Sequence, residues 1–251
     1  LNGSNAVVVR ASDAAGNSSA QTHQSLIIDT TAPPSASFSG SGITNSPTPI
    51  LSGTGEPGAT LKLRVSGTPY LATVDAAGGW SVDLKSATPA AGNFLTLSEG
   101  VHSVTAQQVD PAGNQGATAS ITLHVDTVPP PVPTVTSTGQ TRSTTPLITG
   151  RGEPGGTTRL DVPGATFEAR VDESGDWAIS IGTGEAVLGR PSLNANGANE
   201  IRVRSVDAAG NLSAQRLHLL IVDTTAPEAP AVLSPTLGNL PKPVVSGTAE
   251  P

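Results

Sequence analysis

The 251-residue chain contains no cysteine, and only 2% of its residues are aromatic. Without cysteine it forms no disulfide framework and carries out no thiol chemistry. With two Trp, one Tyr and three Phe, its cores must be built from Val, Leu, Ile and Ala. No apolar run approaches the roughly 20 residues of a membrane-spanning helix. The sequence therefore predicts neither a disulfide scaffold nor a helical membrane span, and no signal peptide is visible.

Charge is also sparse, at 13% of residues, and the net charge is −7. Nucleic-acid binding depends on neutralising phosphates with basic side chains, so this balance argues against nucleic acid as a partner. It permits cation binding. The 28 Gly and 22 Pro indicate many short strands joined by turns.

The chain repeats itself at a fixed step of 97 residues. Its most evident signals are a turn of the form Asp-x-Ala-Gly-Asn and a link of the form Asp-Thr-x-x-Pro. A Gly-x-x-Glu-Pro turn and a Val-Asp-x-x-Gly-x-Trp turn recur at the same step. The repeated aspartates are Asp13, Asp110 and Asp207 in the turn and Asp29, Asp126 and Asp223 in the link.

This spacing predicts a tandem array of one module of about 100 residues, a usual size for a domain. Two complete copies are expected at 31–127 and 128–224. Residues 1–30 would be the C-terminal part of a preceding copy, and 225–251 the N-terminal part of a further one. Because Pro251 stops within a motif, the sequence is expected to be a monomeric fragment of a longer protein.

Apolar residues alternate with polar ones along each expected strand. This period of two is typical of half-buried antiparallel strands. Seven short strands per module, joined by Gly-rich turns, predict an all-β chain of seven-stranded immunoglobulin-like β-sandwich domains arranged end to end as a rod. The apolar sets include Leu61, Leu63 and Val65; Trp80, Val82 and Leu84; and Leu123 and Val125.

The repeated acids are expected to meet at one end of each module. If the strands are labelled A to G, the B–C, D–E and F–G loops lie at the same pole as the start of strand A. Of the 20 Asp and Glu residues, 11 fall in four repeat positions. One junction would gather Asp29, Glu56, Asp75 and Asp110, the next Asp126, Glu153, Asp172 and Asp207, and a third Asp223 and Glu250.

Carboxylates packed together repel one another, and a hard divalent cation relieves that repulsion. Calcium takes six to eight oxygen ligands, including carbonyls of the kind that Gly-rich turns expose. The sequence therefore predicts structural Ca²⁺ at the junctions, with Mg²⁺ or Mn²⁺ left open. The alternative is turn chemistry alone, since Asp, Asn and Gly all favour tight turns. Whether Asn114 and Asn211 act only through their turns is left open.

Other chemistry has little support. The four histidines do not recur at the 97-residue step, so a repeated zinc site is not expected. No nucleophile, base and acid recur or converge, so we expect no enzyme. Trp80 and Trp177 could serve as platforms for sugars, but their place in the apolar pattern favours core packing.

The set of motifs resembles the bacterial immunoglobulin-like repeats of giant type I-secreted (RTX, biofilm-associated) surface adhesins. The resemblance covers essentially the whole chain and rests on "GTGEPGATL", "VDAAGGWSVDL", "VTAQQVDPAGN" and links like "VDTTAP". It implies extracellular rods stiffened by calcium at module junctions. Carried over, it places ligands on Asp29, Glu56 and Asp110, and on Asp126, Glu153 and Asp207.

We therefore expect a stalk segment of an extracellular adhesin at the bacterial cell surface, serving adhesion or biofilm formation. Its partners would be neighbouring repeats of the same chain and, through other domains, a host or cell surface. The alternative is a module that itself recognises a glycan or host surface protein. The most variable region between the copies, "SATPAAGNFLTLSEG" against "TGEAVLGRPSLNANGA", is where such recognition would be sought.

Overall fold

The computed structural model describes residues 2–234, 241–242 and 244–249. Within these ranges the chain consists of strands, turns and loops, and no segment forms a helix that could cross a membrane. The chain divides into two compact units, residues 1–128 with 208–211 and residues 129–207 with 212–251. The predicted all-β class is confirmed.

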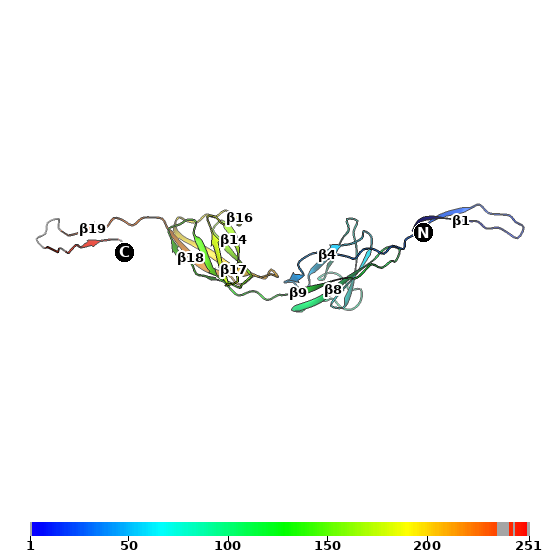
Figure 1. The fold of residues 1–251 in the computed structure, drawn as a ribbon, viewed down its shortest axis with the longest axis horizontal. Coiled ribbons are helices and arrows are strands. Elements are labelled where there is room, and N and C mark those ends of the chain that lie inside the picture. The colour runs from blue at the N-terminus through cyan, green and yellow to red at the C-terminus, as the bar shows by residue number, and fades with distance from the viewer. Residues whose placement is uncertain (1, 235–240, 243, 250–251) are drawn as a thin grey trace. The chain divides into compact units, whose positions relative to one another are not determined.

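The first unit contains a β-sandwich of seven strands, which we call the first sandwich. A five-stranded sheet has the order β3-β9-β8-β5-β6, and β4 pairs with β7 in the facing sheet. The long strands β8 and β9 lie side by side (Figure 1). The strands are β3 (Ile43–Thr44), β4 (Ile50–Thr54), β5 (Thr60–Val65), β6 (Thr68–Thr73), β7 (Gly79–Asp83), β8 (Gly100–Val109) and β9 (Ala119–Val125).

The second unit contains a related sandwich, which we call the second sandwich. Its sheets have the orders β10-β12-β15 and β11-β18-β17-β13-β14-β16. It has two short strands more than the first, because the opening strand is divided into β10 and β11 and because β16 is added at an edge. Its strands are β10 (Thr134–Val135), β11 (Gln140–Thr141), β12 (Leu147–Arg151), β13 (Thr157–Val162), β14 (Ala165–Arg170), β15 (Asp176–Ser180), β16 (Ala186–Gly189), β17 (Asn196–Val206) and β18 (Arg216–Asp223).

Each sandwich has its own apolar core, filled from both sheets as the alternating pattern predicts. Leu61 and Leu63 from one sheet meet Trp80 and Val82 from the other in the first core. Trp80 and Trp177 are 4% and 2% exposed, so the prediction that they pack in the cores is confirmed. The Trp80 ring meets Phe38 edge to face, with ring centroids 5.5 Å apart.

The described residues also form two hairpins outside the sandwiches. Strand β1 (Gly3–Val9) pairs with β2 (Thr22–Ile28), and β19 (Ala231–Val232) pairs with β20 (Gly247–Thr248), both antiparallel. That these hairpins are parts of further copies stays a prediction from the sequence, as do the repeat boundaries at 30, 127 and 224.

Candidate functional site: the turns and links

Three turns of the first sandwich lie at one end, which we call its turn pole. Thr60, which begins β5, is opposite both Thr73 at the end of β6 and Val109 at the end of β8. The turn after β4 joins this group, because Gly55 N donates a hydrogen bond of 2.9 Å to Gly78 O. The predicted common end for the loops of Glu56, Asp75 and Asp110 is therefore present.

The second sandwich has the same arrangement. Thr157 at the start of β13 is opposite Arg170 on β14 and Val206 on β17. Gly152 N donates to Gly175 O at 2.9 Å, which repeats the bond of the first sandwich at a step of 97 residues. The loops of Glu153, Asp172 and Asp207 thus share the equivalent end.

The aspartates after β6 and β14 hold their own turns closed. Asp75 Oδ1 accepts N–H bonds from Ala77 and Gly79 at 2.9 and 2.8 Å. Asp172 Oδ1 accepts the two equivalent bonds in the second sandwich, both 2.9 Å long. Turn chemistry, the alternative reading, is therefore present at these positions.

Asp110 has the most enclosed of these carboxylates, with 5% of the residue exposed. Its Oδ1 accepts the Asn114 backbone N–H, and its Oδ2 accepts the Asn114 side-chain amide, both at 2.8 Å. The bond from the Asn114 side chain holds the pKa of Asp110 below its ordinary value, against an opposing effect of burial. A carboxylate has about four acceptor positions, so a bonded Asp110 still has oxygen lone pairs for a cation.

The link before the first sandwich is bonded to this turn pole. Asn114 Nδ2 also donates to the backbone oxygen of Asp29 at 3.0 Å. Gln108, fully buried, accepts the Glu56 N–H at 2.6 Å through Oε1 and donates to Pro34 O at 2.8 Å through Nε2. Asn114 therefore does more than shape its own turn, because its amide contacts both the turn carboxylate and the link carbonyl.

The same link contact recurs one step later. Asn211 Nδ2 donates to the backbone oxygen of Asp126 at 2.8 Å. The sequence left open whether Asn114 and Asn211 act only through their turns; the structure shows that both also bind a link. Sequence reasoning missed Gln108 because the equivalent position, 205, is Ser, so the glutamine does not recur at the 97-residue step. Its only distinguishing feature is that it is a buried polar side chain on a strand.

The link aspartates form a turn of their own. The Oδ1 of Asp29, Asp126 and Asp223 accepts the N–H of the residue two positions on, at 2.9, 3.1 and 2.9 Å. This is the Asx turn that favours Asp before a change of chain direction. One carboxylate oxygen of each thus fixes the link.

A cation that these residues fit is hard and oxygen-preferring. The groups at the turn pole are carboxylates of Asp and Glu together with link carbonyls, and the carbonyl of Asp29 and the carboxylate of Asp110 contact the same Asn114 nitrogen. All-oxygen sets of this kind suit Ca²⁺ or Mg²⁺ and not a soft metal.

Over the residues that the structure describes, no three His, Asp or Glu side chains are gathered closely enough to hold a metal ion. Glu250 lies outside the described residues. Metal binding stays a prediction for Asp29, Glu56, Asp75, Asp110, Asp126, Glu153, Asp172, Asp207 and Asp223.

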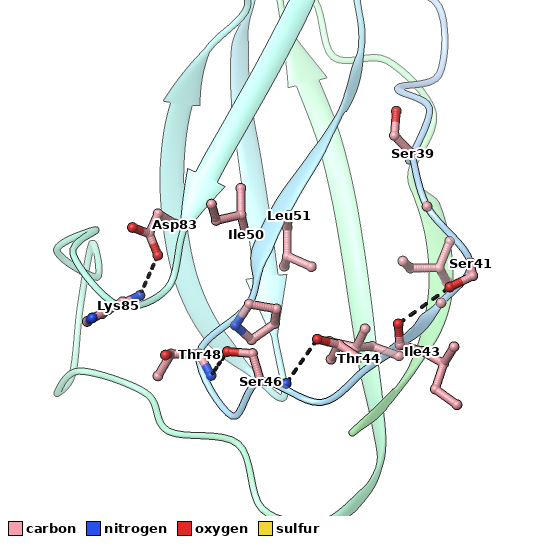
Figure 2. Close-up of a pocket in the computed structure, with 15 residues that line it drawn as sticks. Ser39, Ser41, Ile43, Thr44, Ser46, Thr48, Ile50, Leu51, Asp83 and Lys85 are labelled. Carbon is pink, nitrogen blue, oxygen red and sulfur yellow. Dashed lines mark hydrogen bonds between the residues drawn. The ribbon is translucent and has the colours of Figure 1, made fainter. Parts of the chain in front are cut away.

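A groove of about 600 Å³ lies at the other end of the first sandwich, between the segment leading into β4 and the end of β7. Figure 2 shows that its polar side chains serve local turns. Thr44 Oγ1 accepts the Ser46 N–H at 3.1 Å, Ser46 Oγ accepts the Thr48 N–H at 3.2 Å, and Asp83 Oδ1 accepts the Lys85 N–H at 2.9 Å. These contacts stabilise the loop and assemble no reactive group.

The two facing sheets with their shared cores and crossing connections define a class: immunoglobulin-like β-sandwich repeats. More specifically, residues 34–127 match the family model described as the bacterial Ig-like domain. That part of the chain is a bacterial Ig-like domain, and the resemblance drawn from the motifs is confirmed for it. No curated protein matches the chain.

Several solved structures are similar to this chain. One is a tetra-tandem repeat from the extending region of a large adhesion protein, with 21% identity, coverage of 92% of this chain and 59% of that chain, and a TM-score of 0.34. A second is a Ca²⁺-stabilized adhesin that helps an Antarctic bacterium reach out and bind ice, with 26% identity, coverage of 87% and 56%, and a TM-score of 0.31. A third is the BSP domain of a biofilm-associated protein, with 20% identity, coverage of 78% and 29%, and a TM-score of 0.27. The chain spans little more than half the length of the first two.

Proposed function

We propose that the chain is a non-enzymatic stalk segment of a large bacterial surface adhesin, and that Ca²⁺ binds where each link meets a turn pole. One observation carries the proposal: the turn amides of Asn114 and Asn211 bind the carbonyls of Asp29 and Asp126, one repeat apart. A stalk made of repeated spacer modules needs the same contact at each link, because each link has to be held in the same way. The similarity to adhesin repeats, one of them from a Ca²⁺-stabilized protein, supports this function.

The stalk acts by ligand linkage. A cation that binds only the folded, docked link stabilises that arrangement by RT ln(1 + [L]/Kd). Extracellular calcium modules have Kd values of about 10⁻⁴ to 10⁻³ M. At about 2 mM Ca²⁺, each site would then add roughly 0.6–1.8 kcal/mol. Such sites fill outside the cell and stay largely empty in the cytosol, so the stalk would be pliable before export and stiff afterwards.

Calcium titration by calorimetry tests the site directly. The metal-stripped chain should bind Ca²⁺ with a Kd in the range given above, and Asp29→Asn with Asp126→Asn should remove most of the heat. Asparagine keeps the oxygen that accepts the Asx-turn bond, so these changes remove charge while leaving the turn. Glu185→Ala, which removes an exposed acid from a loop of the second sandwich, is the matched control.

Small-angle scattering tests the consequence for the stalk. The largest dimension should rise and its distribution narrow when Ca²⁺ replaces chelator, and the paired Asp→Asn variant should not respond. A chain that is equally extended in chelator would show that the links are stiff without metal and would contradict the stiffening role.

Recognition of a glycan or host protein is the second candidate, and the region between β7 and β8 and its counterpart favour it. That region is a loop in the first sandwich but carries β16 in the second, with Val187 and Leu188 exposed. Residues 183–196 of the second sandwich can be replaced by residues 86–99 of the first. Loss of a glycan-array signal on this replacement would support recognition by this region. A signal that survives the exchange would contradict it.

A further inference from the structure

The threonine of each link donates hydrogen bonds to a side chain that lies outside the repeat motifs. In the N-terminal segment, Asn2 Oδ1 accepts the backbone N–H of Thr30 at 3.1 Å and its hydroxyl at 2.7 Å. In the second sandwich, Asn196 Oδ1 accepts the same two bonds from Thr224, both at 2.8 Å. Both acceptors lie beside the first residues of a long strand, ahead of β1 and at the start of β17.

The first sandwich makes the same contact with a different side chain. Glu99, directly before β8, accepts the Thr127 N–H at 3.0 Å and the Thr127 hydroxyl at 2.7 Å through Oε2. The three acceptors lie 97 residues apart at positions 2, 99 and 196. Residue identity therefore varies, while a side-chain oxygen at one place and the paired bonds to threonine are kept.

We propose that this oxygen acceptor is a positioning residue, a link clamp, that fixes the path of each Asp-Thr link before any metal binds. The inference rests on the proposed calcium function and deepens it, because the clamp acts on the link Asp and does not itself need to touch the ion. Thr127 follows Asp126 directly, so holding its N–H and hydroxyl fixes the peptide between them.

The geometry shows why both bonds matter. One bond to a hydroxyl leaves the backbone free to rotate, and one bond to an N–H leaves the side chain free. Two bonds from one residue to one acceptor restrict both. The Asx turn then restricts the other side of the link, because Asp126 Oδ1 accepts the Val128 N–H at 3.1 Å. A link ordered in this way loses less conformational freedom when a cation binds, which raises affinity.

Amide hydrogen exchange on the full 251-residue chain, stripped of metal and kept in chelator, tests the clamp. Glu99→Ala should speed exchange of the Thr127 amide by about threefold to tenfold, the range expected for one exposed hydrogen bond. Glu99→Gln keeps an oxygen at the same reach and should stay close to wild type. Thr127→Val, which removes only the hydroxyl donor, should give a smaller acceleration. The amides of Thr30 and Thr224 should not change in any of these variants.

Glu99→Ala and Glu99→Gln remove the same charge. A difference in Ca²⁺ affinity between them therefore reports on positioning of the link and not on electrostatics. Glu99→Ala should weaken binding severalfold more than Glu99→Gln does. Unchanged exchange at Thr127 in Glu99→Ala, or equal effects of Ala and Gln, would overturn the clamp. If the wild-type chain takes up no Ca²⁺, the calcium function fails on its own, and exchange in chelator still decides the clamp.

Discussion

The edges formed by β6 and β14 occupy the same place in the two sandwiches but are completed differently. In the second, β16 pairs with β14 and extends the sheet. In the first, the corresponding loop gives the edge a backbone bond from Ala90 N to Pro69 O, 2.8 Å long. Pro69 has no N–H to offer there, and Pro89 stands where the second sandwich has Ala186. Proline at these two places disfavours a further edge strand, because it offers no N–H to a ladder.

The outward faces of β9 and β18 also differ between the two sandwiches. Leu217 and Leu219 on β18 are 60% and 56% exposed, whereas Ser120 and Thr122 stand at those places on β9. By contrast, the bonds that close the turns after β6 and β14, and the bonds from Asn114 and Asn211 to the links, recur in both copies. The contacts at the turn poles thus recur between the two copies, whereas the residues on the sides of the module differ.

The largest effect is expected from opening a cavity in one core. Leu63 and Leu160 are equivalent, and both are fully buried. Leu63→Ala and Leu160→Ala should each lower the free energy of unfolding by about 2–5 kcal/mol in their own sandwich. Chains with Trp80 or Trp177 as their single Trp would assign each fluorescence transition. If either substitution shifted both transitions equally, the two sandwiches would not unfold independently.

The buried amide of Gln108 is a feature of the first sandwich alone, since the equivalent residue of the second is Ser205. Gln108→Ala removes a buried amide that bonds Glu56 and Pro34, and leaves their backbone groups short of partners. The cost should be about 1–3 kcal/mol in urea unfolding of the first sandwich. Gln115→Ala, at an exposed position, is the control and should cost little. Equal losses for both would show that the bonds to Gln108 do not stabilise the pole.

Acid should weaken the first turn pole in the metal-free chain. The pKa of Asp110 is lowered in the folded chain, chiefly by the Asn114 side chain, from an ordinary value of 3.8. The unfolded state therefore binds more protons at acidic pH. The stabilisation is complete above pH 3.8 and is lost as the pH falls through the lowered pKa. An NMR titration should find Asp110 below 3.8, and Asn114→Ala should bring it back up; a titration at or above 3.8 in wild type would contradict this.

The smallest change in the free energy of unfolding is expected when an ion pair on the side of the second sandwich is removed. Arg159 and Glu168 form an ion pair of 2.9 Å, and each side chain is 34% exposed. Glu168→Gln should cost less than about 1 kcal/mol, and the cost should shrink at high salt. Thermal unfolding at low and high salt measures this. A loss as large as that of Gln108→Ala would show that the side of the module carries more stability than its end.

Much of this organisation could be predicted from the sequence. The 97-residue step and the alternation around Leu61, Trp80 and Leu123 predict the strands, the cores and the shared pole of the loops, because periodic burial depends on local pattern. Strand β16 was missed, since four residues without alternation carry no strand signal. Gln108 and Glu99 were missed because their partners lie far along the chain and because the repeat does not keep their identity.

The most direct test of the central claim is the thermal unfolding of the metal-stripped chain in excess chelator and then in about 2 mM Ca²⁺. We expect a rise in Tm of roughly 3–14 °C, which follows from the linkage energy and a domain of about 100 residues. Asp29→Asn with Asp126→Asn should abolish the rise while leaving the Tm in chelator almost unchanged. No rise with Ca²⁺, and none with Mg²⁺, would contradict the calcium site and leave the repeated acids as turn residues alone.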